Sequence, residues 1–215
     1  EWAAAYALTQ AEPGSDANAR RTTAAKVGHT YLLNGEKTFV SNGGFADIFI
    51  VFAKLGGKLT AFIVEKSMPG VEVGREEHKM GICGSSTATI ILNNVYVPEA
   101  NLLGEPGKGF KIAMNVLNLG RFNLGCACLG AARLCFEEAS TYAKERKQFG
   151  KTISDFQGVQ FQLAHAATEL EAARLLVYNA ARLRDAGEPF LTEAAMCKLF
   201  SSNAAEHVTS LAVQL

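Results

Sequence analysis

The sequence has no excess of either charge and no long apolar run. Lys and Arg together number 21, Asp and Glu also number 21, and the formal net charge is zero. Proteins that bind nucleic acid or an anionic membrane surface usually carry a basic stripe, so this balance argues against both partners. No apolar run of about 18 residues or more appears, which predicts no membrane span, and no signal or transit peptide is visible.

Cysteine and histidine are also sparse, and neither follows a ligand pattern. The five cysteines are odd in number and include no CxxC pair, which argues against a disulfide framework and favours a reducing compartment. The four histidines lie without metal-ligand spacing, so the sequence predicts no metal site. No GxSxG motif supports a hydrolase, and the glycine-rich stretch 104–109 lacks GxGxxG spacing and is interpreted as a turn.

What is present indicates a globular protein. The chain has 215 residues, of which 48% are hydrophobic and 20% charged, enough to bury a core in one or two domains. It starts at Glu1 rather than Met and stops at Leu215 inside an apolar periodic pattern, so we expect it to be part of a longer protein.

Residues 1–103 show the two-residue alternation of antiparallel strands. Asn34-Gly35 predicts one hairpin and Gly56-Gly57 a second. The predicted strands are residues 31–33, 38–40, 47–53, 59–64, 71–73, 87–92 and 95–98.

From Gly109 the period becomes helical. Residues 110–146 predict one long helix whose three interior glycines would serve close helix packing. Ser154-Asp155-Phe156-Gln157 fits a capping box for a second helix, which stops at Gly187 and Pro189. A third helix runs from about Thr192 to the end. The predicted fold is segregated α+β: an antiparallel β-barrel or sandwich domain, residues 1–103, and an incomplete up-and-down helical bundle, residues 104–215.

Two short segments of the first half stand out. Residues 6–16 (YALTQAEPGSD) and 37–44 (KTFVSNGG) each run an alternating strand into a turn rich in Gly, Ser, Asn and Asp. Such a strand holds hydroxyl and backbone N–H groups rigid, and the turn lets a ligand approach the main chain. Together they indicate a cradle for a planar cofactor with polar edges.

Taken with residues 146–150 (RKQFG), these segments resemble the acyl-CoA dehydrogenase flavoproteins over the whole chain. Residues 160–190 are most similar to the short/branched-chain members. The sequence departs from the usual pattern at Gln10-Ala11, where Glu-Pro is common, while Gly14-Ser15-Asp16 is kept.

The resemblance implies an FAD site and assigns its residues. Leu8 and Thr9 would bond the isoalloxazine with Tyr6 beside it, and Ser15 would contact both cofactor and thioester chain. Phe39, where Trp is usual, would cover the flavin face, and Ser41 would reach flavin N5. The full cofactor set implied is Tyr6, Leu8, Thr9, Gly14, Ser15, Phe39, Val40, Ser41, Arg146, Phe149, Gln157 and Gln214. From the residues alone, Thr9 could be a plain strand residue, Phe39 a core aromatic and Ser41 a turn initiator.

The helical half would serve a neighbouring subunit and the substrate. The resemblance sends Arg146, at the end of the long helix with Phe149, to the FAD pyrophosphate of the neighbour, although an Arg there could simply complement the helix dipole. Gln157 could either cap the second helix or contact the flavin across a dimer interface. Gln214 would approach the adenylate half of FAD. Ser15, Phe110, Asn118 and Arg121 would line the acyl-pantetheine channel, although Arg121 could also extend to solvent.

No catalytic base is assigned within the chain. In most family members a glutamate in a loop beyond the segment where this chain stops takes the Cα proton, and in a minority it precedes the arginine on the substrate-facing helix. Here that position is Gly120, which has no side chain. Glu99, Glu137 and Glu169 are interpreted as solvated surface residues.

The implied activity is FAD-dependent α,β-dehydrogenation of a short or branched-chain acyl-CoA, with electrons passing to electron-transfer flavoprotein. The alternatives are an acyl-CoA oxidase that uses oxygen and a non-catalytic member that acts in assembly. We expect a homodimer or homotetramer, located in the mitochondrial matrix if eukaryotic and in the cytoplasm if bacterial. The chain by itself is expected to bind FAD weakly and to be inactive.

Overall fold

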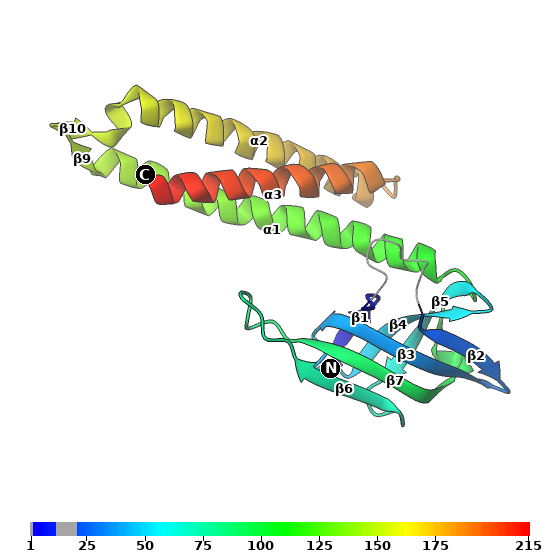
Figure 1. Cartoon of the computed structure of the whole chain (residues 1–215). Coiled ribbons are helices and arrows are strands. Elements are labelled where there is room, and N and C mark those ends of the chain that lie inside the picture. Colours follow the sequence, from blue (N-terminus) through cyan, green and yellow to red (C-terminus); the bar gives the residue numbers. More distant parts are fainter. Residues whose placement is uncertain (1, 12–20) are drawn as a thin grey trace. The chain divides into compact units, whose positions relative to one another are not determined.

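The computed structural model describes residues 2–11 and 21–215, which form two compact units, residues 1–114 and 115–215. The three α-helices and most of the strands are labelled in Figure 1. Their bounds are β1 Ala4–Ala7, β2 Thr23–Val27, β3 Thr30–Ser41, β4 Ile48–Leu55, β5 Lys58–Glu65, β6 Val71–Glu76, β7 Thr87–Pro98, η1 Glu99–Asn101, β8 Leu102–Leu103, α1 Gly109–Glu145, β9 Lys147–Gln148, β10 Lys151–Thr152, η2 Ile153–Asp155, α2 Gln157–Asp185 and α3 Leu191–Gln214.

The first unit is built on one mixed eight-stranded sheet. Its strand order is β6-β7-β3-β2-β4-β5-β8, with β1 added beside β4. The pairs β1–β4 and β2–β4 are parallel and the others antiparallel. The predicted β domain followed by a helical bundle is confirmed, with the difference that the sheet is mixed rather than purely antiparallel and that no pairing among the described strands closes it into a barrel. Parallel pairs join segments far apart in the chain, and no local turn signal in the sequence marks them.

The hairpin predicted at Asn34-Gly35 does not form. Residues 30–41 are one continuous strand, β3, and its register with β7 shifts between Leu33 and Gly35. Gly35 has φ +143°, and a Cβ there would lie 2.8 Å from the Cα of Thr22. The glycine thus serves a bulge and a close approach of two chains rather than a turn.

The hairpin predicted at Gly56-Gly57 is confirmed. β4 and β5 pair from Ile48↔Glu65 to Leu55↔Lys58, and both glycines have positive φ, +56° and +80°. Such values suit a two-residue turn whose twist matches the flanking strands. The two strands also supply much of the core, because Phe49, Val51, Phe62 and Val64 are fully buried.

Residues 87–98 form one strand, β7, where the sequence predicted two. Asn94 adopts φ +53° within it, and its N–H bonds the Asn34 side chain at 2.8 Å. Asn tolerates this left-handed conformation, so the strand continues through Asn94. Because Asn is also common in turns, the sequence predicted a break here.

The second unit is an up-and-down arrangement of three helices, as predicted (Figure 1). Its core has two clusters along the helices. Ala132 of α1, Ala166 and Leu170 of α2, and Val208 and Leu211 of α3 form one of them. Phe122, Val177, Ala180 and Cys197 form the other. None of the described helices is both long enough and apolar enough to cross a membrane.

The predicted capping box before α2 is wrong. Ser154 and Asp155 lie in the short helix η2, and the residue that precedes α2 is Phe156, which makes no side-chain cap. The Thr152 hydroxyl instead bonds Ser154 Oγ at 2.8 Å and Asp155 Oδ2 at 2.9 Å. The side chains of Ser154 and Asp155 therefore contact Thr152 rather than the first turn of α2. Gln157 is exposed at the start of that helix.

The three glycines of α1 play different roles. A Cβ at Gly125 would lie 3.2 Å from Cys197 Sγ on α3, so Gly125 does serve close packing. Gly120 and Gly130 are exposed, and a Cβ at either would meet no heavy atom of the described chain within 4 Å. The packing prediction is therefore correct for Gly125 and wrong for the other two.

Candidate functional site

The two segments singled out in the sequence meet in the first unit. The backbone N–H of Thr38 in β3 donates to the carbonyl oxygen of Thr9 at 2.9 Å, just beyond the end of β1. Lys37 stabilises this junction from the protein interior, because its buried Nζ donates to the carbonyl of Phe52 at 2.6 Å and to that of Leu8 at 3.4 Å. One wall is thus made from residues about thirty positions apart.

A bulge sets the direction of the side chains on this wall. The register between β3 and β7 shifts between Lys37 and Val40, and consecutive residues Lys37 and Thr38 are both buried. Phe39 adopts φ +53° and leaves 63% of its surface exposed. Bulges re-aim side chains next to functional sites in this way. An exposed aromatic ring held in an unfavourable backbone conformation is typical of a site that meets a ligand.

The other predicted residues of the first unit fall into two groups. Thr9 and Ser41 are exposed, whereas Leu8 and Val40 are buried. Leu8 and Val40 could therefore contact a ligand only through their backbone N–H and C=O groups. Tyr6 is half-buried: its hydroxyl donates to the carbonyl of Ala113 at 3.3 Å, and its ring meets Phe52 edge-on at 5.2 Å. Gly14 and Ser15 lie outside the described residues.

Two residues of this wall were missed from the sequence. The hydroxyl oxygen of Thr38 is buried and has no hydrogen-bond partner among the residues that the structure describes. Gln10, noted only as a departure from the family pattern, is buried, and its side-chain amide bonds Thr22 and the carbonyl of Glu36, while its oxygen accepts from the N–H of Arg21 at 2.9 Å. Gln10 therefore ties the segment after β1 to β3. In the sequence, the only indication that Thr38 or Gln10 has a role in the wall is that each is a polar residue within or next to a strand.

In the second unit, the structure brings together one predicted pair. Arg121 donates from its guanidinium to Asn118 Oδ1 at 2.8 Å on α1. Phe110, at the start of the same helix in the first unit, is 41% exposed. The pairing fixes the direction of the Arg121 side chain, which favours an ordered polar group over one that extends freely into solvent.

The residues predicted to face a neighbouring subunit are all exposed. Arg146 follows the end of α1, and Phe149 sits in the β9–β10 turn with φ +53° and 94% exposure, rather than at the helix end. Its ring lies 6.2 Å from that of Phe156. Gln157 and Gln214 are exposed at the start of α2 and the end of α3.

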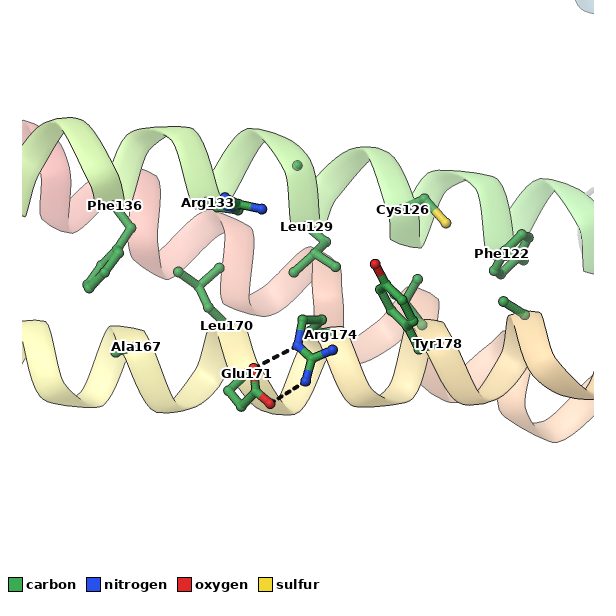
Figure 2. Close-up of a pocket in the computed structure, with 13 residues that line it drawn as sticks. Phe122, Cys126, Leu129, Arg133, Phe136, Ala167, Leu170, Glu171, Arg174 and Tyr178 are labelled. Carbon is green, nitrogen blue, oxygen red and sulfur yellow. Dashed lines mark hydrogen bonds and ion pairs between the residues drawn. The ribbon is translucent and has the colours of Figure 1, made fainter.

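A separate groove of about 630 Å³ runs between α1 and α2 (Figure 2). Its floor is mostly apolar, and the ion pair of Glu171 with Arg174 at 2.6 Å lies at its rim. Cys126 also lines it, but burial raises the pKa of this thiol, as it does for Cys197, so both remain protonated at neutral pH and neither is a ready nucleophile. The residues that line the groove do not form a recognisable catalytic arrangement.

Comparison with known proteins matches both units to one family. The family model "Acyl-CoA dehydrogenase, middle domain" matches residues 5–95, and "Acyl-CoA dehydrogenase, C-terminal domain" matches residues 107–215. The mitochondrial short/branched chain specific acyl-CoA dehydrogenase of Rattus norvegicus is 46% identical over 97% of the chain and 50% of its own length. The acryloyl-CoA reductase (NADH) of Anaerotignum propionicum is 49% identical over 98% of the chain and 55% of its own.

Among solved structures, the butyryl-CoA dehydrogenase of Megasphaera elsdenii superposes with a TM-score of 0.91 at 46% identity. The match covers 98% of this chain and 57% of that one. The chain therefore spans about half the length of the relatives that it matches.

Proposed function

The chain belongs to the acyl-CoA dehydrogenase family, and on that basis we propose that the intact protein is an FAD-dependent dehydrogenase of short or branched-chain acyl-CoA thioesters. The observation that carries the proposal is the wall in which the Thr38–Thr9 hydrogen bond joins the two segments and the bulge turns Phe39 outward. We also keep the division into a β domain, residues 1–103, and a helical domain, residues 104–215, as a proposal.

The residues of the wall fit a flavin. An exposed aromatic ring at Phe39 and exposed hydroxyl residues at Thr9 and Ser41 suit a planar heterocycle with polar edges, and the buried Thr38 oxygen still has accepting and donating capacity. Tyr6, Leu8, Thr9, Phe39, Val40 and Ser41 would hold the ring system. When bound, FAD supplies the acceptor for a hydride from the substrate.

The chain's own side chains bind and orient. Phe39 would exclude water from one face of the ligand, and Ser41 would donate a hydrogen bond where negative charge develops. Asn118 and Arg121, already paired on α1, would line the acyl channel with Phe110. Because Gly120 has no side chain, the proton from Cα must go to a base outside the residues assigned here, which we propose is a glutamate C-terminal to residue 215.

Partners and assembly follow from the same proposal. Electrons would pass to electron-transfer flavoprotein, and Arg146, Phe149 and Gln157 would contact the FAD of a neighbouring subunit in a homodimer or homotetramer, while Gln214 would approach the adenylate half of FAD. Their exposure is consistent with an interface. An intact protein that ran as a monomer with full flavin occupancy would refute the three assignments across the interface. Location in the mitochondrial matrix or the bacterial cytoplasm depends on the source.

A second candidate is the reverse reaction, reduction of a 2-enoyl-CoA. It is favoured by the acryloyl-CoA reductase relative, whose 49% identity matches that of the dehydrogenases. The same wall would serve either direction, since both exchange a hydride between substrate carbon and flavin.

The decisive experiment is purification of the intact protein, its visible spectrum and its turnover. A flavin spectrum, bleached by butyryl-CoA or 2-methylbutyryl-CoA and restored by electron-transfer flavoprotein, supports the dehydrogenase. Reoxidation by air as fast as by the protein acceptor would indicate an oxidase, and turnover only of enoyl-CoA with a reduced donor would indicate the reductase. A protein that binds no flavin would defeat all three and leave a role in assembly.

A further inference from the structure

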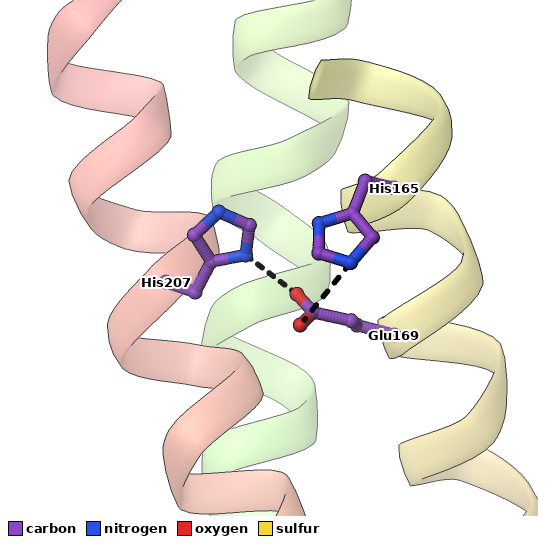
Figure 3. A group of neighbouring side chains, drawn as sticks. All are labelled: His165, Glu169 and His207. Carbon is purple, nitrogen blue, oxygen red and sulfur yellow. Dashed lines mark hydrogen bonds and ion pairs between the residues drawn. The ribbon is translucent and has the colours of Figure 1, made fainter. Parts of the chain in front are cut away.

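Three side chains from two helices meet on the second unit, away from every residue assigned above. His165 and Glu169 lie one turn apart on α2, and His207 projects from α3 toward them (Figure 3). Glu169 Oε2 is 2.6 Å from His207 Nδ1, and Glu169 Oε1 is 3.9 Å from His165 Nε2. One ligand atom from each residue lies within 4.8 Å of the other two.

A simple ion pair explains only part of this arrangement. One protonated histidine beside one carboxylate would account for His207 and Glu169. His165 lies within ion-pair distance of the other oxygen of the same carboxylate, and its ring is 5.3 Å from the His207 ring, so two imidazoles share one negative charge. Two protonated imidazoles so close together would repel each other, whereas two neutral ones present lone pairs that a cation can share.

We propose that His165, Glu169 and His207 bind one divalent transition-metal ion, of which Zn²⁺ is the first candidate. Two imidazole nitrogens and one carboxylate oxygen are a set that zinc uses with a fourth position left to water. Zinc bonds of about 2.0–2.2 Å place ligand atoms roughly 3.3 Å apart in a tetrahedral site. The separations of 2.6 Å to Glu169 Oε2 and 3.9 Å to Glu169 Oε1 fall on either side of this value, and with all three ligand atoms within 4.8 Å of one another, the side chains would have to draw together around an ion. Calcium and magnesium prefer oxygen ligands alone.

The backbone that carries these ligands is already fixed by packing. Their chain neighbours Ala166, Leu170 and Val208 belong to one buried cluster that joins α2 to α3. His165 and Glu169 share a helix face because they are four residues apart. The site needs no movement of either helix, and a bound ion would cross-link them.

Glu169 differs from the solvated surface residue expected from the sequence. Its side chain is only 26% exposed, against 66% for His165 and 45% for His207. The four histidines have no ligand spacing among themselves, whereas His165 and Glu169 are four residues apart on one helix. The third ligand comes from another helix, which no spacing reveals.

The proposal is tested on the full chain, stripped with a chelator, by calorimetric titration with Zn²⁺ and by visible absorption with Co²⁺. We expect one ion per chain, a higher thermal midpoint with Zn²⁺, and binding at least tenfold weaker in His207→Gln and Glu169→Gln. His165→Gln should show the same loss without unfolding the protein, because His165 is the most exposed of the three. His78→Gln, which alters an exposed histidine of the first unit, is the matched control and should bind as the wild type does.

Three results would overturn the proposal. They are the absence of saturable binding in the wild type, equal binding by the wild type and His165→Gln, and a sulfur-to-cobalt absorption band that disappears in Cys83→Ser. The last would place the ion on the exposed thiol of Cys83 instead.

Discussion

The Thr38 amide and the Thr9 carbonyl, 2.9 Å apart, join the end of β1 to the middle of β3. Through this bond the exposed hydroxyl of Thr9 and the exposed ring of Phe39 belong to one surface. The site proposed for FAD depends on that surface keeping its shape, and the predictions below separate what shapes it from what touches the ligand.

Phe39 can be removed without harming the fold. Phe39→Gly relieves a left-handed backbone conformation that costs a residue with a Cβ about 1 kcal/mol, so thermal stability of the apoprotein should stay equal or rise. Flavin affinity of the intact protein should fall at least tenfold, because the ring that covers the ligand is lost. The measurement is flavin fluorescence titration. Phe45→Ala, on a neighbouring ring that is 58% exposed, should leave affinity unchanged, and an equal loss there would contradict the role of Phe39.

Lys37 supports the wall from inside. Lys37→Met removes the donor to the carbonyls of Phe52 and Leu8 in a fully buried setting. A buried acceptor left without its partner costs about 1–3 kcal/mol, so urea unfolding should show a loss of that order. Lys66→Met is the control, since Lys66 bonds the Gly44 carbonyl in an exposed setting and should lose far less. Similar losses in both variants would argue against the burial effect.

The glycines of α1 should respond in opposite directions to alanine. Gly125→Ala places a methyl group 3.2 Å from Cys197 Sγ and should destabilise the protein by about 1–3 kcal/mol. Gly130→Ala meets nothing within 4 Å in the described chain and should stabilise the helix by about 1 kcal/mol. Adding Cys197→Ala to Gly125→Ala should recover part of the loss in chemical denaturation. A double variant that is merely additive would show that the sulfur is not the obstacle.

Glu76 should make the first unit sensitive to acid. Hydrogen bonds from the Ser86 hydroxyl and the Thr87 N–H lower the pKa of this carboxyl. The unfolded chain then takes up the proton at a higher pH than the folded chain does, so stability is present at neutral pH and is lost as the pH falls through the lowered pKa. Glu76→Gln should flatten the acid limb of a melting-temperature profile, whereas Glu72→Gln on the same strand should preserve it.

Much of this fold could be predicted because its signals are local. The Gly56-Gly57 turn and the three helices depend on neighbours in sequence, and each was predicted correctly. Asn34-Gly35 misled because the same residues that favour a turn also permit a bulge against Thr22. Ser154-Asp155-Phe156-Gln157 misled because Ser154 lies in a short helix, where its hydroxyl contacts that of Thr152, and α2 begins after Phe156 without a side-chain cap. The wall itself was indicated by its two segments, but the roles of Lys37, Thr38 and Gln10 depend on burial, which one sequence does not reveal.

The parallel pairing of β1 with β4 has a consequence for the order of folding. The β4–β5 hairpin closes a two-residue loop, whereas β1 must find Ile48–Val51 across the whole of β2 and β3. Long loops close more slowly and at greater entropic cost, so β1 should dock onto β4 after the β4–β5 hairpin has formed, as should β7 onto β3, whose pairing spans a similar or longer stretch of chain. The segment that carries Thr9 would then become ordered after the hairpin on which it docks, so the site proposed for FAD would be completed later than the core beneath it.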